Sequence, residues 1–158
     1  SSVTGVEVKC HTTNDVLEHI YTSGAAAAYI LADLNWNARE DKVELMLQLK
    51  EEGFARLYGQ QGAVRIEDVM KLAQTGEYPE ELYLLVDRLR LPSSDEDLRT
   101  RLHSSVETAF DKGNGTVYVR KEFKDGESET KQFINSPVAN LLLRRGIPRK
   151  GWEEFYQL

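Results

Sequence analysis

Apolar positions along the chain alternate between helical and extended spacing, the pattern of a domain that packs helices on a sheet. Thr12 and Thr13 are suitable N-caps for a first helix, which we expect to stop near Ser23 and Gly24. One face of this helix carries Val16, Leu17, Ile20 and Tyr21.

The next segment predicts a strand, a helix and a returning strand. Residues 27–34 form an apolar run, and residues 39–52 have helical spacing that ends at Gly53. Residues 54–58 are short, apolar and aromatic, as expected of a strand. Together these segments predict a right-handed βαβ unit.

The second half continues with alternating elements. Residues 63–66 predict a short strand and residues 67–73 a brief amphipathic helix. Residues 82–91 have the composition of a strand, and residues 95–112 form the longest helical pattern, followed by Gly113.

A hairpin is expected near the end of this region. Residues 115–123 and 129–134 read as its strands, and Asp125-Gly126 is a dipeptide that suits the positive φ angles of a tight turn. We therefore expect an α/β or α+β fold, a mixed sheet with helices packed on it, over residues 1–134. Residues 135–158 form a short C-terminal appendage, with helical stretches expected at 137–145 and 150–157.

Composition narrows the class of protein. The chain has 158 residues, of which 41% are hydrophobic and 29% charged, values typical of one folded domain. Its net charge of −6 lacks the basic excess of a free-standing nucleic-acid-binding domain. No apolar run approaches the roughly 20 residues that span a bilayer, and no secretion signal is visible. We expect a cytoplasmic protein with no membrane association.

A search for catalytic chemistry finds little. No glycine-rich loop ends in Gly-Lys-Ser or Gly-Lys-Thr, and the single cysteine, Cys10, has no second thiolate with which to form a disulfide or a zinc site. His103 is adjacent to Ser104 on one helix, so the two side chains do not face each other as a nucleophile and a base. Asp15 and His19, four residues apart, predict a surface ion pair. We expect no active site, metal or cofactor in this segment.

Arginines remain as candidate binding residues. Arg56 lies in an expected strand, Arg88 in another, and Arg99 and Arg101 early in the long helix. If the strands are neighbours and the helix packs over them, these side chains gather at one rim of the sheet. Arginine at such a place suits contacts with a protein partner, and solvated surface charge is the alternative.

Particular segments carry a family resemblance. Residues 84–89, LLVDRL, and residues 101–110, RLHSSVETAF, resemble the V-V-D-R and R-L-A-D-S-x-E-T-A-L segments of the UvrA family, the damage-recognition ATPases of bacterial nucleotide excision repair. Residues 47–57, with Gly53, Phe54 and Arg56, resemble its L-x-x-Q-G-F-V-R-V segment. Residues 6–20 are similar to the stretch that follows its first cysteine motif, so the similarity runs from about Val6 to Val119.

The resemblance implies a protein-interaction domain that docks UvrB, the helicase-like subunit that receives damaged DNA. It implies no catalysis within the segment and contact with DNA only through the parent complex. Matched residue by residue, the family's interface arginines fall on Arg56, Arg88 and Arg101, and a family aspartate falls on Ser104. The family's cysteine pairs and ATPase motifs are absent from this sequence, so an excised domain and a diverged relative both stay open.

Two further hypotheses come from other classes. The C-terminal segment carries Arg144, Arg145, Arg149 and Lys150, interleaved with Trp152, Phe155 and Tyr156. Such a basic and aromatic stretch suits an accessory contact with DNA, or it packs its aromatic rings on the domain. The third hypothesis is a small enzyme whose catalytic residues are scattered along the sequence.

Overall fold

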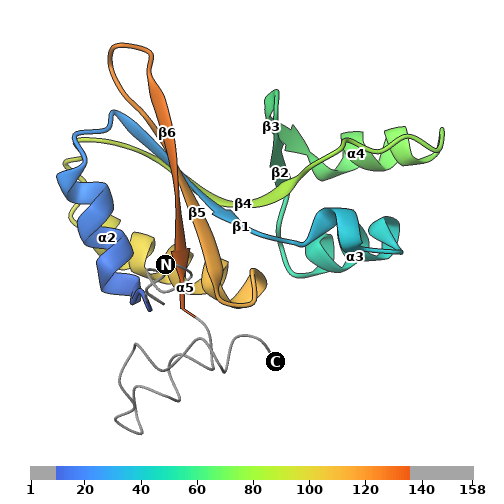
Figure 1. Cartoon of the computed structure of the whole chain (residues 1–158), viewed down its shortest axis with the longest axis horizontal. Coiled ribbons are helices and arrows are strands. Elements are labelled where there is room, and N and C mark those ends of the chain that lie inside the picture. Colours follow the sequence, from blue (N-terminus) through green and yellow to red (C-terminus); the bar gives the residue numbers. More distant parts are fainter. Residues whose placement is uncertain (1–9, 136–158) are drawn as a thin grey trace, which may run out of the picture.

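The computed structural model describes residues 10–135, which form an antiparallel sheet with helices packed on it (Figure 1). The strand order is β3-β2-β4-β1-β5-β6. The strands are β1 (Ala27–Ala32), β2 (Arg56–Gly59), β3 (Gly62–Arg65), β4 (Tyr83–Arg90), β5 (Thr116–Glu122) and β6 (Ser128–Ile134). The helices are α2 (Thr13–Thr22), α3 (Lys42–Glu51), α4 (Ile66–Ala73) and α5 (Leu98–Lys112), with a 3-10 turn η1 (Trp36–Ala38). The expected α+β class is confirmed, and the helices expected at 137–145 and 150–157 lie outside the described residues.

Helix α2 begins with the cap that its sequence predicts. The Thr12 hydroxyl accepts a hydrogen bond from the Asp15 N–H at 3.1 Å, and the Asp15 carboxylate accepts one from the Thr12 N–H at 2.8 Å. This reciprocal capping box satisfies two backbone donors at the helix start. The expected ion pair between Asp15 and His19 is wrong, because the Asp15 carboxylate accepts the Thr12 N–H and His19 contacts Lys121.

The glycines at two chain reversals have the predicted roles. Gly113 ends α5 by donating its N–H to the Ala109 carbonyl, and a Cβ there would lie 2.1 Å from the Thr116 carbonyl oxygen. Gly126 turns the β5–β6 hairpin at φ +90°. Asp125 contributes differently from the expectation, since its carboxylate accepts the Glu127 N–H at 2.9 Å.

Strand β4 lies between β1 and β2, where the expected βαβ unit has no strand. It pairs antiparallel with β1 on one side and with β2 on the other, so β1 and β2 point the same way without being neighbours. Every pairing in the described sheet is antiparallel. The directly paired parallel strands of a simple βαβ unit are therefore not formed, because a strand from later in the chain inserts between them.

The helices cover one face of the sheet. In Figure 1, α2 and α5 lie together toward one end, and α3 and α4 toward the other. All of them contribute to one continuous cluster of buried side chains that includes Ile30, Leu84 and Val119 from the strands. A smaller cluster, with Tyr29, Leu31 and Leu85 at its centre, lies on the opposite face. We call that opposite side of the sheet the open face.

A buried lysine lies under α2. The Lys121 side chain is only 2% exposed, and its ammonium lies 2.6 Å from His19 Nε2 and 3.2 Å from the Glu129 carboxylate. The neutral tautomer of His19 with no proton on Nε2 can accept a hydrogen bond from the Lys121 ammonium at this distance. Burial, followed by repulsion from Lys121 and Lys131, lowers the pKa of His19 from its ordinary value of 6.5.

This arrangement predicts a pH-dependent stability. Below about pH 6.5 the unfolded chain protonates His19 while the folded chain resists it, so the free energy of unfolding decreases as the pH falls from 7 to 5. The variant His19→Gln retains an acceptor for Lys121 and does not titrate. Urea unfolding at several pH values should therefore show a shallower decrease for the variant. Parallel profiles for the two proteins would contradict the assignment.

Candidate functional site

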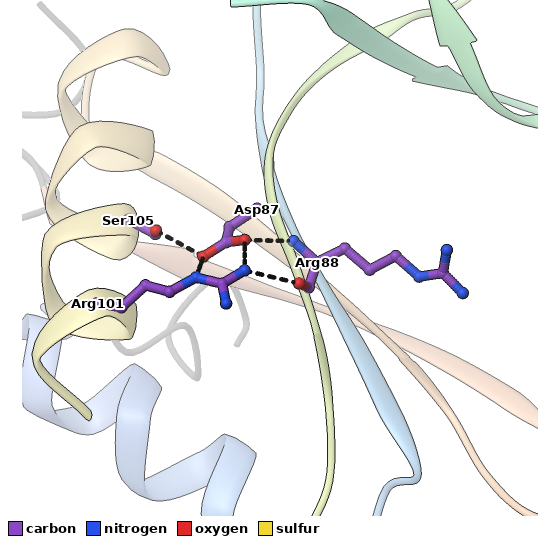
Figure 2. Close-up of polar contacts among 4 residues, drawn as sticks. All are labelled: Asp87, Arg88, Arg101 and Ser105. Carbon is purple, nitrogen blue, oxygen red and sulfur yellow. Dashed lines mark hydrogen bonds and ion pairs between the residues drawn. The ribbon is translucent and has the colours of Figure 1, made fainter. Parts of the chain in front are cut away.

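A bulge in β4 determines which of two adjacent charged side chains faces the helices. The β1–β4 register shifts between Ile30 and Leu31, so that Ile30 pairs with Asp87 and Leu31 with Leu85. A bulge of this kind re-aims side chains relative to strict alternation. Asp87 consequently points to the helix-covered face, and Arg88 extends away from it on the other side of the strand (Figure 2).

Asp87 joins β4 to α5. Its carboxylate accepts hydrogen bonds from Arg101 Nε at 3.0 Å and from the Ser105 hydroxyl at 2.8 Å, and Arg101 Nη2 contacts its other oxygen. That other oxygen also accepts the Arg88 N–H at 2.8 Å. Arg101 Nη2 in turn donates to the Arg88 carbonyl at 3.1 Å, so one guanidinium holds both the acid and the backbone beside it (Figure 2). We call these four residues the Asp87 network.

Burial and charge make this network stronger than an ordinary surface pair. The Asp87 side chain is 13% exposed, whereas that of Arg101 is 51% exposed. The hydrogen bonds and charge of Asp87 raise the pKa of Arg101. A two-pronged arginine–carboxylate contact has directional as well as electrostatic value. The network thus fixes how the first turns of α5 sit on β4.

The open face is aromatic and carries Arg88. Its guanidinium lies 5.3 Å from the ring centre of Tyr29, within the range of a cation–π contact. Tyr29 also packs against Tyr58, with ring centres 5.1 Å apart. Tyr83 and Tyr118 form a second pair at 5.2 Å. No described helix covers these rings. The open face is therefore lined by packed aromatic rings, and the Arg88 guanidinium lies against one of them.

The tyrosine hydroxyls have fixed partners. The Tyr83 hydroxyl donates to the Glu81 carboxylate at 2.5 Å, and the Tyr118 hydroxyl accepts from Gln132 at 3.0 Å. Burial raises the pKa of both phenols, and Glu81 raises that of Tyr83 further. These phenols are therefore neutral at physiological pH and serve as hydrogen-bonding and packing groups.

The structure divides the arginines singled out from the sequence. Arg56 is exposed on β2, where strand alternation places it on the same face as Tyr58, and Arg88 shares the open face. Arg101 lies across the sheet within the Asp87 network, and Ser104 is exposed on α5 next to it. Arg144, Arg145, Arg149 and Lys150 lie outside the described residues.

The sequence did not identify Asp87 as a site residue. It also did not identify the tyrosines of the open face, Tyr29, Tyr58, Tyr83 and Tyr118. The hairpin prediction contained a usable signal for part of this set, because Tyr118 and Arg120 alternate with the buried Val117 and Val119 along β5. The bulge that re-aims Asp87 left no comparable signal, since it depends on how β1 and β4 pair.

In the described part of the chain, polar residues considered for catalysis contact neighbouring acids. His103 Nδ1 lies 2.7 Å from the Glu107 carboxylate, and the Ser105 hydroxyl donates to the Asp87 carboxylate. Among residues 10–135 no group of His, Cys, Asp and Glu has the arrangement of a metal site. No helix within the same range is long and apolar enough to cross a membrane.

The fold and site define a class: an α+β domain whose distinctive features are a charged and aromatic sheet face and an acid–arginine network. The family model of the UvrA interaction domain matches residues 11–122, from α2 to β5, and the chain belongs to that family. It is similar to the UvrABC system protein A of Methanothermobacter thermautotrophicus, with 29% identity over 124 residues. That alignment covers 78% of this chain and 13% of the longer protein.

The Asp87 network yields a stability prediction. The variant Asp87→Asn keeps the shape of the side chain but removes the charge that balances Arg101. We expect the free energy of unfolding to decrease by about 1–2 kcal/mol, discounted for the exposure of Arg101. Chemical denaturation measures it. The control Asp111→Asn removes an exposed acid from α5 and should change stability by less than about 0.5 kcal/mol. Equal effects of the two substitutions would contradict the role given to Asp87.

Proposed function

We propose that this chain is the part of a UvrA-related nucleotide excision repair protein that docks a UvrB-like partner. Membership of the UvrA interaction domain family supports a repair role. The observation that carries the docking surface is the orientation of Arg88, which extends from the open face while its neighbour Asp87 is engaged on the other side of the strand (Figure 2). DNA is met only through the larger complex.

Arg88 and Arg56 are the proposed contact residues. Both side chains belong to the uncovered side of the sheet, and Arg88 is supported by the Tyr29 ring. An arginine preordered against an aromatic ring loses less side-chain entropy when it meets a partner, and arginine and tyrosine are the residues that most often dominate interface affinity. The proposed interface is therefore electrostatic at its contacts and aromatic at its base.

Arg101 has a different proposed role. Its guanidinium holds Asp87 and the Arg88 carbonyl, so it positions Arg88 through the backbone. Ser104, exposed on α5 about one turn of helix after Arg101, is proposed to contribute only at the margin of the interface. The function proposed for the segment is binding, with no catalysis of its own and no cofactor.

This proposal predicts the effect of one substitution on affinity. In calorimetric titrations of the chain with purified UvrB of the same organism, Arg88→Ala should weaken binding about tenfold or more, the range of an interface hot spot. Arg99→Ala is the matched control, because Arg99 also lies over a tyrosine, Tyr21, and pairs with an acid, Glu18, but on the helix side.

The outcomes separate the parts of the proposal. Equal affinities of wild type and Arg88→Ala would remove Arg88 from the interface. Failure of the wild-type chain to bind UvrB at all would overturn the docking function. Unfolding curves of both variants should match that of the wild type, because neither side chain is in the core.

A further inference from the structure

Two arginines flank one tyrosine across the open face. Tyr29 on β1 pairs with Arg88 on β4 and with Arg120 on β5. Alternation therefore places all three side chains on the open face in one row, with the arginine Cα atoms about 10 Å apart, two interstrand spacings. Each guanidinium rests on a ring: Arg88 lies 5.3 Å from the centre of Tyr29, and Arg120 lies 6.0 Å from that of Tyr58.

Arg120 has an unused donor. Its Nε is buried and makes no hydrogen bond to any described residue. Its closest acid is Glu122, whose carboxylate lies 4.0 Å from Nη2, at the outer limit of an ion pair. A buried donor without an acceptor costs free energy, and such a group in a folded protein calls for an explanation.

Arg120 lies in the walls of two neighbouring hollows. The two open hollows, of about 540 and 260 Å³, share Tyr58, Gly59, Gln60 and Arg120 in their walls. The larger extends past Arg88, and the smaller extends to Tyr118. The two hollows therefore adjoin between the open face and the β2–β3 turn, and we call them together the tyrosine groove.

We propose that the tyrosine groove binds an acidic peptide segment of the protein partner, with Arg120 and Arg88 each receiving a carboxylate. The planar fork of arginine matches a carboxylate in two-pronged geometry, and the tyrosines give the segment an apolar floor. Carboxylates two residues apart in an extended chain, with Cα atoms about 7 Å apart, lie within reach of both flexible side chains. The inference rests on the proposed function for the identity of the partner, and it adds Arg120 and the acidic character of the bound segment.

The charges in the groove favour a peptide over a nucleic acid. Glu122 lines the Arg88 end of the groove, and Glu81 lines the Tyr118 end. A groove that follows a phosphate backbone is positive along its length, whereas here acids bracket two arginines. In a peptide, only some side chains are charged. Its carboxylates can therefore bind the arginines while neutral backbone N–H groups lie beside Glu122 and Glu81.

The test compares peptide and oligonucleotide probes. Fluorescence anisotropy of a labelled hexaglutamate peptide and of a labelled hexathymidylate, both at low salt, measures binding to the 158-residue chain. We expect the peptide to bind, and Arg120→Met to weaken that binding at least fivefold. The control Arg99→Met removes an arginine that also lies over a tyrosine, and it should leave the affinity unchanged. No binding of the peptide, equal affinity of Arg120→Met, or tighter Arg120-dependent binding of the oligonucleotide would overturn the inference.

A spectroscopic measurement keeps the test independent of the variant's folding. In the wild-type chain, addition of hexaglutamate should shift the NMR signal of the Arg120 Nε–H downfield, as a hydrogen bond forms. An unchanged Arg120 signal at peptide saturation would overturn the inference.

Titration with UvrB distinguishes this inference from the proposed function. If UvrB binds the wild type and Arg120→Met equally, the role of Arg120 falls and the docking function stands. If UvrB does not bind the wild type while hexaglutamate binds in an Arg120-dependent way, the docking function falls and the groove remains a carboxylate-binding site.

Discussion

The hydrogen-bonded carboxylate of Asp87 is the interaction on which the rest of the surface depends. It ties α5 to β4 through Arg101 and Ser105, at the point where a bulge interrupts strand alternation. Continued alternation from Leu84, which belongs to the helix-side core, would place Asp87 on the open face and Arg88 against the helices, and the bulge reverses that assignment. A single local irregularity therefore stabilises the helix packing and orients a candidate binding residue.

The packing of the helices on one side of the sheet also determines which side chains form the candidate binding surface. The described helices all pack on one face, so on the other face Tyr29 and its neighbouring rings are covered only by one another and by the side chains beside them. An antiparallel sheet tolerates this arrangement because its two faces alternate in composition. Here the uncovered side chains are aromatic and positively charged, and their rings hold the arginines in place. The acidic net charge of the whole chain conceals this local arrangement.

Local signals in the sequence predicted local structure well. The Thr12 cap, the stop at Gly113 and the turn at Gly126 each follow from backbone requirements that a residue and its neighbours determine. Pairing between distant strands was less accessible: the insertion of β4 between β1 and β2 leaves no local trace. The buried contact of His19 with Lys121, 102 positions away, was missed for the same reason, and an ion pair with Asp15 was expected instead.

In the candidate site, too, the residues could be predicted from the sequence but their arrangement in space could not. The sequence indicated Arg56, Arg88 and Arg101 as a set, but only the strand register could show that Arg88 lies on the face opposite the helix that carries Arg101. The most direct measurement is an NMR map of the isotopically labelled chain titrated with unlabelled UvrB. If UvrB binds the open face, we predict signal changes centred on Tyr58, Arg88 and the β2–β3 turn, with the signals of the outer side of α5 unchanged. Changes confined to that outer side of α5, with the open face unaffected, would contradict this prediction.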